Sequence, residues 1–200
     1  KSSYDLFLHD VSVTPNSFRT NQAIADESLQ LYMKNFNKPT DSVKYLTQAQ
    51  KYYEASENIL PCFSNQVGLG NTSLFQRNYD KAIDRFKKAQ NLIDNTVIKE
   101  RIFTAFYQYG RYEAQVNNNL TKAKDLLMNA YLLDSSKSEI VTDLGMVLGL
   151  NKEFNHALYY FEKSYKMDPN NETIVNNLIR TYILLGYQDK ANELMTKLKK

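Results

Sequence analysis

Small residues recur along the chain at a spacing of about 34 residues, and this recurrence constrains the fold more than any other feature. Ala123, Ala157 and Ala191 stand 34 residues apart. A large apolar residue follows four positions later and a small residue seven positions later in Ala49-Tyr53-Ser56, Ala82-Phe86-Ala89, Ala123-Leu127-Ala130 and Ala157-Phe161-Ser164. Such steps place the three side chains on one face of a helix. A fixed period of this length is typical of stacked helical units.

Helix–helix contact explains why small and large residues alternate. Gly70 and Gly145 each lie twelve residues before the alanine of their unit. A Gly or Ala facing an Ala on the antiparallel partner lets the two backbones approach closely, and the aromatic residue fills the wedge toward the next pair. Pro61 and Pro169 close two units, because proline cannot continue a helix and pre-sets φ for the next one. Each pair then keeps an apolar face that must stack on a neighbour.

These residues resemble the signature of the tetratricopeptide repeat family, a 34-residue helix–turn–helix. Residues 138–171 match it best, and the matching residues are Leu144, Gly145, Ala157, Phe161, Ser164 and Pro169. The resemblance implies an all-α, right-handed α-solenoid of four to five helix pairs, with ten or eleven helices.

The same alignment predicts the domain boundaries. Residues 1–17 are expected to be the entry helix of a preceding half-repeat. The array over 18–200 divides into approximate repeats at 18–62, 63–94, 95–137, 138–171 and 172–200. The first repeat carries an insertion at "MKNFNKPTDS", expected as a long loop or a helix extension. The third has about seven extra residues near "NTVIKERIFTAF", expected to lengthen its first helix or its entry loop.

Composition and residue pattern favour no catalytic, cofactor or metal site. The net charge is +3, from 25 basic and 22 acidic residues, and the basic residues are scattered, which does not favour nucleic acid as a partner. One cysteine and two histidines in distant repeats, His9 and His156, cannot build a closed metal site. The stretch "GLGN" lacks the strand and the further glycine of a dinucleotide loop. Without a long apolar run, direct membrane insertion by this segment is not expected. We therefore predict a protein that is not an enzyme.

The resemblance implies that the first helix of each pair lines a concave groove that binds a protein or a peptide. The groove side chains it projects are mixed and polar, which suits an extended or helical peptide. They are Arg19, Gln22, Asp26, Asn71, Tyr107, Gln108, Arg111, Thr142, Asp143, Met146, Asn176, Asn177 and Arg180. The lysine set by which some family members hold a terminal carboxylate is absent from these positions. The alternative is that these side chains are simply solvated or covered by another part of the parent chain. The oligomeric state is left open.

The entry segment carries a second resemblance. Leu6, Phe7, Asp10, Pro15, Ser17 and Asn21 are similar to the segment that precedes the repeats in transmembrane O-mannosyltransferase-like proteins. The chain starts without an initiator methionine and already in an amphipathic pattern, so we expect it to be part of a longer protein. The second resemblance implies the extracytoplasmic tail, periplasmic or lumenal, of a polytopic membrane glycosyltransferase-like protein. Otherwise a cytoplasmic scaffold is expected.

Overall fold

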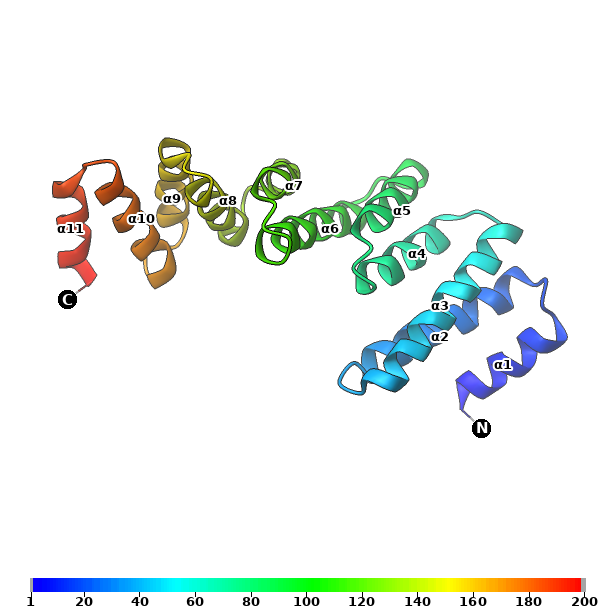
Figure 1. Ribbon diagram of the computed structural model, residues 1–200. Coiled ribbons are helices and arrows are strands. Elements are labelled where there is room, and N and C mark those ends of the chain that lie inside the picture. Colours follow the sequence, from blue (N-terminus) through cyan, green and yellow to red (C-terminus); the bar gives the residue numbers. More distant parts are fainter. Residues whose placement is uncertain (1, 199–200) are drawn as a thin grey trace. The chain divides into compact units, whose positions relative to one another are not determined.

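The computed structural model describes residues 2–198, which form eleven helices joined by short turns, with no strand in that range (Figure 1). The predicted all-α fold class is confirmed. Lys1, Lys199 and Lys200, at the two ends of the predicted segments, lie outside the described residues. The helices are α1 (Ser3–Val13), α2 (Phe18–Lys34), α3 (Pro39–Ile59), α4 (Phe63–Phe75), α5 (Tyr79–Leu92), α6 (Thr96–Gln115), α7 (Leu120–Leu133), α8 (Ser138–Leu150), α9 (Phe154–Met167), α10 (Glu172–Leu184) and α11 (Gln188–Leu198).

Side-chain caps start several of these helices. The Ser17 hydroxyl accepts a hydrogen bond from the Thr20 backbone N–H (3.3 Å) at the start of α2. Asparagine side chains do the same at the starts of α5, α7 and α10, where the caps are Asn78, Asn119 and Asn171. Each cap satisfies an N–H group that has no partner within the helix. The many asparagines of the chain thus partly serve to define where helices begin.

The turns between paired helices repeat in their backbone conformation. One residue with positive φ lies between α4 and α5, α6 and α7, α8 and α9, and α10 and α11: Arg77, Asn118, Lys152 and Gly186. The left-handed conformation is sterically unfavourable for Arg77, Asn118 and Lys152, whereas Gly186 adopts it readily because glycine has no Cβ atom. The last three stand 34 residues apart, whereas Arg77 and Asn118 are 41 apart. The same local geometry therefore returns at the period seen in the sequence.

The extra residues of the two longer repeats lie within helices. α6 has 20 residues, whereas α4, α8 and α10 have 13 each. In the first repeat, α2 has 17 residues and α3 has 21, and only 35–38 separate them. The α2–α3 hairpin is accordingly longer than the α4–α5 hairpin beside it (Figure 1).

Glycines and aromatic rings make the close helix contacts, which corrects the expected pairing of glycine with alanine. A Cβ atom at Gly145 would lie 2.7 Å from the Phe161 ring, and one at Gly70 would overlap the Phe86 ring. Ala157 instead faces Gly149, where a Cβ would lie at the ordinary distance of 3.9 Å. The +4 aromatic ring needs more space than the alanine, so it takes the position opposite the glycine.

The chain divides into two compact units, the first ending at Ala105 and the second beginning at Phe106. In the first unit, a core of buried side chains joins α2, α3 and α4. In the second unit, Leu148, Ala157 and Phe161 pack with Leu178 and Leu194, which joins α8 to α11. Across residues 2–198, no helix combines the length and the apolar character that crossing a bilayer requires.

Candidate functional site

The structure places all thirteen predicted groove residues on the first helix of a pair: α2, α4, α6, α8 or α10. Twelve of them keep exposed or half-buried side chains, and Thr142 is the exception. Thr142 is 7% exposed, its hydroxyl donates to the Ser138 carbonyl (2.8 Å), and it also lies 2.5 Å from the Ser164 hydroxyl. Thr142 therefore offers little side-chain surface to a ligand, unlike the other predicted groove residues. The small Ser164 on α9 leaves room for Thr142 to turn into the contact between the two helices.

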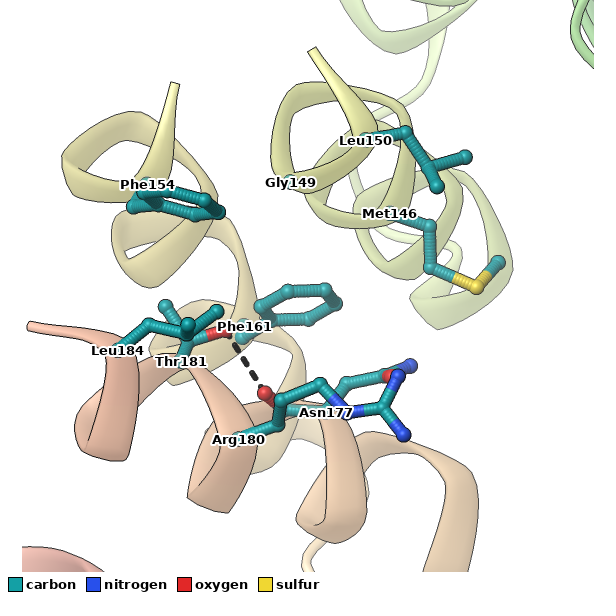
Figure 2. A pocket seen from close by; sticks show the side chains of 9 residues that line it. All are labelled: Met146, Gly149, Leu150, Phe154, Phe161, Asn177, Arg180, Thr181 and Leu184. Carbon is teal, nitrogen blue, oxygen red and sulfur yellow. Dashed lines mark hydrogen bonds between the residues drawn. The ribbon is translucent and has the colours of Figure 1, made fainter. Parts of the chain in front are cut away.

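Three of the predicted residues meet at a pocket of the second unit, which we call the unit-2 pocket. Its volume is about 280 Å³. It is lined by Met146, Gly149, Leu150, Phe154, Phe161, Asn177, Arg180, Thr181 and Leu184. Figure 2 shows Met146 and Leu150 on α8 and the Asn177 and Arg180 side chains on α10, with the Phe161 ring between the two helices.

The unit-2 pocket combines apolar walls with one positive charge. Met146 and Leu150 contribute apolar surface, and Leu150 is 66% exposed. Arg180 is exposed and lies more than 4.0 Å from every carboxylate among the described residues. An exposed guanidinium beside apolar walls suits a ligand that presents an apolar side chain next to a carboxylate or a carbonyl oxygen.

Three further predicted residues of the second unit form a polar network between α6 and α8. The Tyr107 hydroxyl hydrogen bonds with Asp143, and Arg111 Nε lies 3.6 Å from Asp143 Oδ2. The Arg111 guanidinium also lies 5.7 Å from the centre of the Tyr107 ring. Burial raises the pKa of Asp143, although Tyr107 and Arg111 partly oppose that shift. Asp143 Oδ2 is buried, and its ion pair with Arg111 is too long to count as a hydrogen bond.

Two predicted residues of the first unit line a second pocket, which we call the unit-1 pocket. Its volume is about 400 Å³, and Asp26 on α2 and Asn71 on α4 both line it. Other lining residues are Leu29, Gln30, Met33, Tyr53, Phe63, Ser64, Val67 and Gly68. The Tyr53 hydroxyl donates a hydrogen bond to Asp26 Oδ1 (2.5 Å).

The remaining predicted residues contribute less. Gln22 on α2 donates to the Ser64 hydroxyl of α4 (2.7 Å), which ties the two first helices of the first unit together. Arg19, Gln108 and Asn176 are exposed and line neither pocket.

Sequence reasoning missed several residues that line the pockets, notably Tyr53, Met33, Leu150 and Leu184. Tyr53 was interpreted only as a packing aromatic. The signal that could have identified it is the hydroxyl, since the same position holds Phe86, Leu127 and Phe161 in other repeats.

Among the described residues, no three His, Cys, Asp or Glu side chains gather closely enough to hold a metal ion. His9 lies 3.5 Å from Asp10, and His156 lies 3.3 Å from Glu153, but both imidazole rings are largely exposed. They belong to α1 in the first unit and α9 in the second. Neither histidine lines the unit-1 or the unit-2 pocket.

The entry segment has a structural role in this fold. Asn21 is buried and donates to the carbonyls of Pro15 (2.7 Å) and Ser17 (2.8 Å), and Ser17 caps α2. Three of the six residues behind the second resemblance therefore fix the turn between α1 and α2. The comparisons with known proteins do not support an O-mannosyltransferase-like origin.

No protein-family model matches the chain, and no curated protein does. Solved structures do match. YrrB, described as a TPR protein with an unusual peptide-binding site, is 20% identical with a TM-score of 0.58, and the match covers 96% of this chain and 89% of that one. MamA from Desulfovibrio magneticus is 15% identical with a TM-score of 0.56, covering 88% and 93%. The C-terminal part of a TPR repeat-containing protein from Cytophaga hutchinsonii is 16% identical with a TM-score of 0.64, covering 98% and 71%. The helix pairs, their 34-residue period and these matches together show that the chain has the tetratricopeptide repeat fold.

Proposed function

We propose that this protein is a non-catalytic interaction scaffold that binds a peptide or a protein segment on the surface formed by its first helices. The unit-2 pocket is the observation that carries this proposal. Met146, Asn177 and Arg180 come from two different first helices and converge on one pocket. Solvated side chains with no common task would not be expected to share an apolar cavity with a free cation.

The chemistry of the unit-2 pocket suits a peptide. Apolar walls from Met146, Leu150 and Leu184 accept one side chain of the ligand, and its burial supplies most of the affinity. Arg180 and the Asn177 amide can hydrogen bond to the peptide backbone or to an acidic neighbour, which fixes orientation. YrrB, which has the same fold, is itself described as peptide-binding.

A random peptide library displayed on phage and selected against the purified chain tests the proposal. Peptides recovered from the selection are then measured by isothermal titration against Arg180→Ala and Met146→Ala. We expect each substitution to weaken binding about tenfold, because anchors in the centre of an interface each contribute more than 1 kcal/mol.

Asp125→Ala provides the matched control, since Asp125 is an exposed side chain on α7, the second helix of its pair. This variant should bind the selected peptides as tightly as the original chain. The proposal is contradicted if the first-helix variants bind the peptides unchanged while substitutions on the second helices abolish binding.

A further inference from the structure

The first repeat differs from the others at the position of the large buried side chain. Phe86, Leu127 and Phe161 occupy this position in later repeats and are at most 3% exposed. Tyr53 is equally buried, at 3%, but carries a hydroxyl. A buried phenol requires a hydrogen-bond partner, because leaving it without one costs about 1–3 kcal/mol. A partner inside the core would give the Tyr53 hydroxyl a structural role, whereas a partner in a pocket would give it a role in binding.

Gly68 leaves room for the Tyr53 ring against α4. Tyr53 stands on α3, the second helix of its pair, and its ring lies where a Cβ atom at Gly68 of α4 would be. Tyr53 lines the unit-1 pocket together with Asp26 of α2 and Gly68 of α4, so this side chain of the second helix α3 reaches both first helices of the first unit. Its hydroxyl then emerges in the unit-1 pocket, on the surface of the first helices, where it donates to Asp26.

Asp26 carries a negative charge that no cation of the described residues balances within 4.0 Å. Burial raises the pKa of this carboxyl group, and the Tyr53 hydrogen bond only partly offsets that effect. Arg101, a cation of the same unit, donates to Asn71 Oδ1 (2.7 Å) instead. Asp26 is nonetheless an exposed residue, so a ligand cation can reach its carboxylate, and pairing with that cation stabilises the charged form.

The walls of the unit-1 pocket suit an aliphatic chain that ends in a cation. Leu29, Met33 and Val67 line the pocket together with Asp26, and Met33 is 62% exposed. Lysine and arginine have this pattern, with an apolar stem and a charged head. The volume of about 400 Å³ lies within the range of small-ligand sites.

We propose that the unit-1 pocket binds a lysine or arginine side chain of the partner segment, with Asp26 as the charge partner and Tyr53 as the residue that orients Asp26. This inference rests on the proposed function and specifies its ligand. The unit-1 pocket would thus prefer a basic side chain of the ligand. The unit-2 pocket differs, because it carries the positive charge of Arg180.

Small probes test the pocket without a known partner. N-acetyl-lysine methylamide and N-acetyl-arginine methylamide are titrated into the full chain, and binding is followed by amide chemical shifts in two-dimensional NMR. The neutral comparison is N-acetyl-norleucine methylamide, which has the same stem as lysine but no charge. We expect the cationic probes to shift amides of α2 and α4 and to bind at least about tenfold more tightly than norleucine, as a charge-assisted contact implies.

Two variants test separately the charge of Asp26 and its orientation by Tyr53. Asp26→Asn should abolish the preference for the cationic probes. Tyr53→Phe should weaken them by several-fold while the fold is kept, because phenylalanine already occupies this position in Phe86 and Phe161. Asp189→Asn, at an exposed carboxylate on α11, is the control and should bind like the original chain.

Three results would overturn the inference: equal binding of norleucine, unchanged binding by Asp26→Asn, or the absence of shifts in α2 and α4. These results leave the proposed function intact if Arg180→Ala still weakens the selected library peptides. Conversely, Arg180→Ala could leave peptide binding unchanged while the lysine probe still binds. That result would contradict the proposed groove function but support the assignment of the unit-1 pocket.

Discussion

At the scale of single residues, side-chain volume at the helix crossings decides how closely the helices pack. Gly145 and Gly149 lie on the same helix, α8, but meet different neighbours. A methyl group at Gly145 would lie 2.7 Å from the buried Phe161 ring, whereas one at Gly149 would lie 3.9 Å from the Ala157 Cβ. The two positions therefore offer a matched pair for testing the packing.

Gly145→Ala should destabilise the protein by about 1–3 kcal/mol, because the extra methyl group forces the Phe161 ring to move in a filled core. Gly149→Ala should be neutral or stabilising by up to about 1 kcal/mol, since it removes backbone freedom from the unfolded chain without a clash. Urea unfolding followed by circular dichroism measures both. Equal midpoints for the two variants would argue against the close contact of glycine and ring.

Asp143 provides a prediction about pH. Burial raises the pKa of its carboxyl group in the folded state, so folding favours the protonated form. The resulting stability is fully present below the unfolded pKa of about 3.9 and is lost as the pH rises through the higher folded value. The groups around Asp143 are Tyr107, Arg111 and Glu139.

Asp143→Asn removes the ionisation while keeping an acceptor for Tyr107. Its stability relative to the original chain should therefore be higher at pH 7 than at pH 3, as measured by urea midpoints at both values. The exposed control Asp189→Asn should show a smaller change between the two pH values. A stability difference for Asp143→Asn that is independent of pH would contradict the assigned cause.

At the scale of helices, the turn that leads into α2 depends on one buried amide. Asn21 is 2% exposed and donates to two backbone carbonyls, those of Pro15 and Ser17. Asn21→Ala should lower the stability of the first unit by about 1–3 kcal/mol, because the Pro15 carbonyl loses its donor and the Ser17 carbonyl keeps only the backbone N–H of residue 21. Hydrogen exchange should show faster exchange at the start of α2. The neighbouring Gln22→Ala, whose bond to Ser64 lies at the surface, should cost less.

The sequence predicted the helices well because their signals are local and periodic. The spacing of Ala123, Ala157 and Ala191, together with Gly70 and Gly145, indicates which faces meet. The stretch "NTVIKERIFTAF", for which a longer helix or entry loop was expected, lies largely within the 20-residue helix α6.

The site was harder to predict because it depends on small shifts between neighbouring helices. Thr142 was expected in the groove, yet it turns inward because Ser164 leaves space for its hydroxyl. Tyr53 was expected only in the core, yet its hydroxyl reaches the pocket because Gly68 has no side chain. Both outcomes depend on which residue faces which across a contact, and the period alone does not specify this.

At the scale of the whole molecule, each of the two units contains a core, which joins α2 to α4 in the first and α8 to α11 in the second. Stability in repeat proteins is largely a sum of neighbour contacts. Leu178→Ala, which leaves a cavity in the second core, should cost about 2–5 kcal/mol there.

Hydrogen exchange measured by mass spectrometry distinguishes local from global loss. Exchange in α8 to α11 should accelerate in Leu178→Ala, while α2 to α5 should keep the rates of the original chain. Acceleration by the same factor in all helices would instead mean that the chain unfolds as one cooperative block.

The reach of the Tyr53 side chain to two first helices has a consequence for how specificity can change in this architecture. The proposed ligand would touch first helices, but part of the chemistry it would meet is anchored on a second helix, α3. Replacing Tyr53 by phenylalanine would keep the shape and packing of the side chain. It would still change which ligands the unit-1 pocket prefers, because the hydroxyl that orients Asp26 is lost. A substitution on a second helix would therefore change what the proposed site recognises wherever a glycine of the first helix leaves room for the side chain, as Gly68 does for Tyr53.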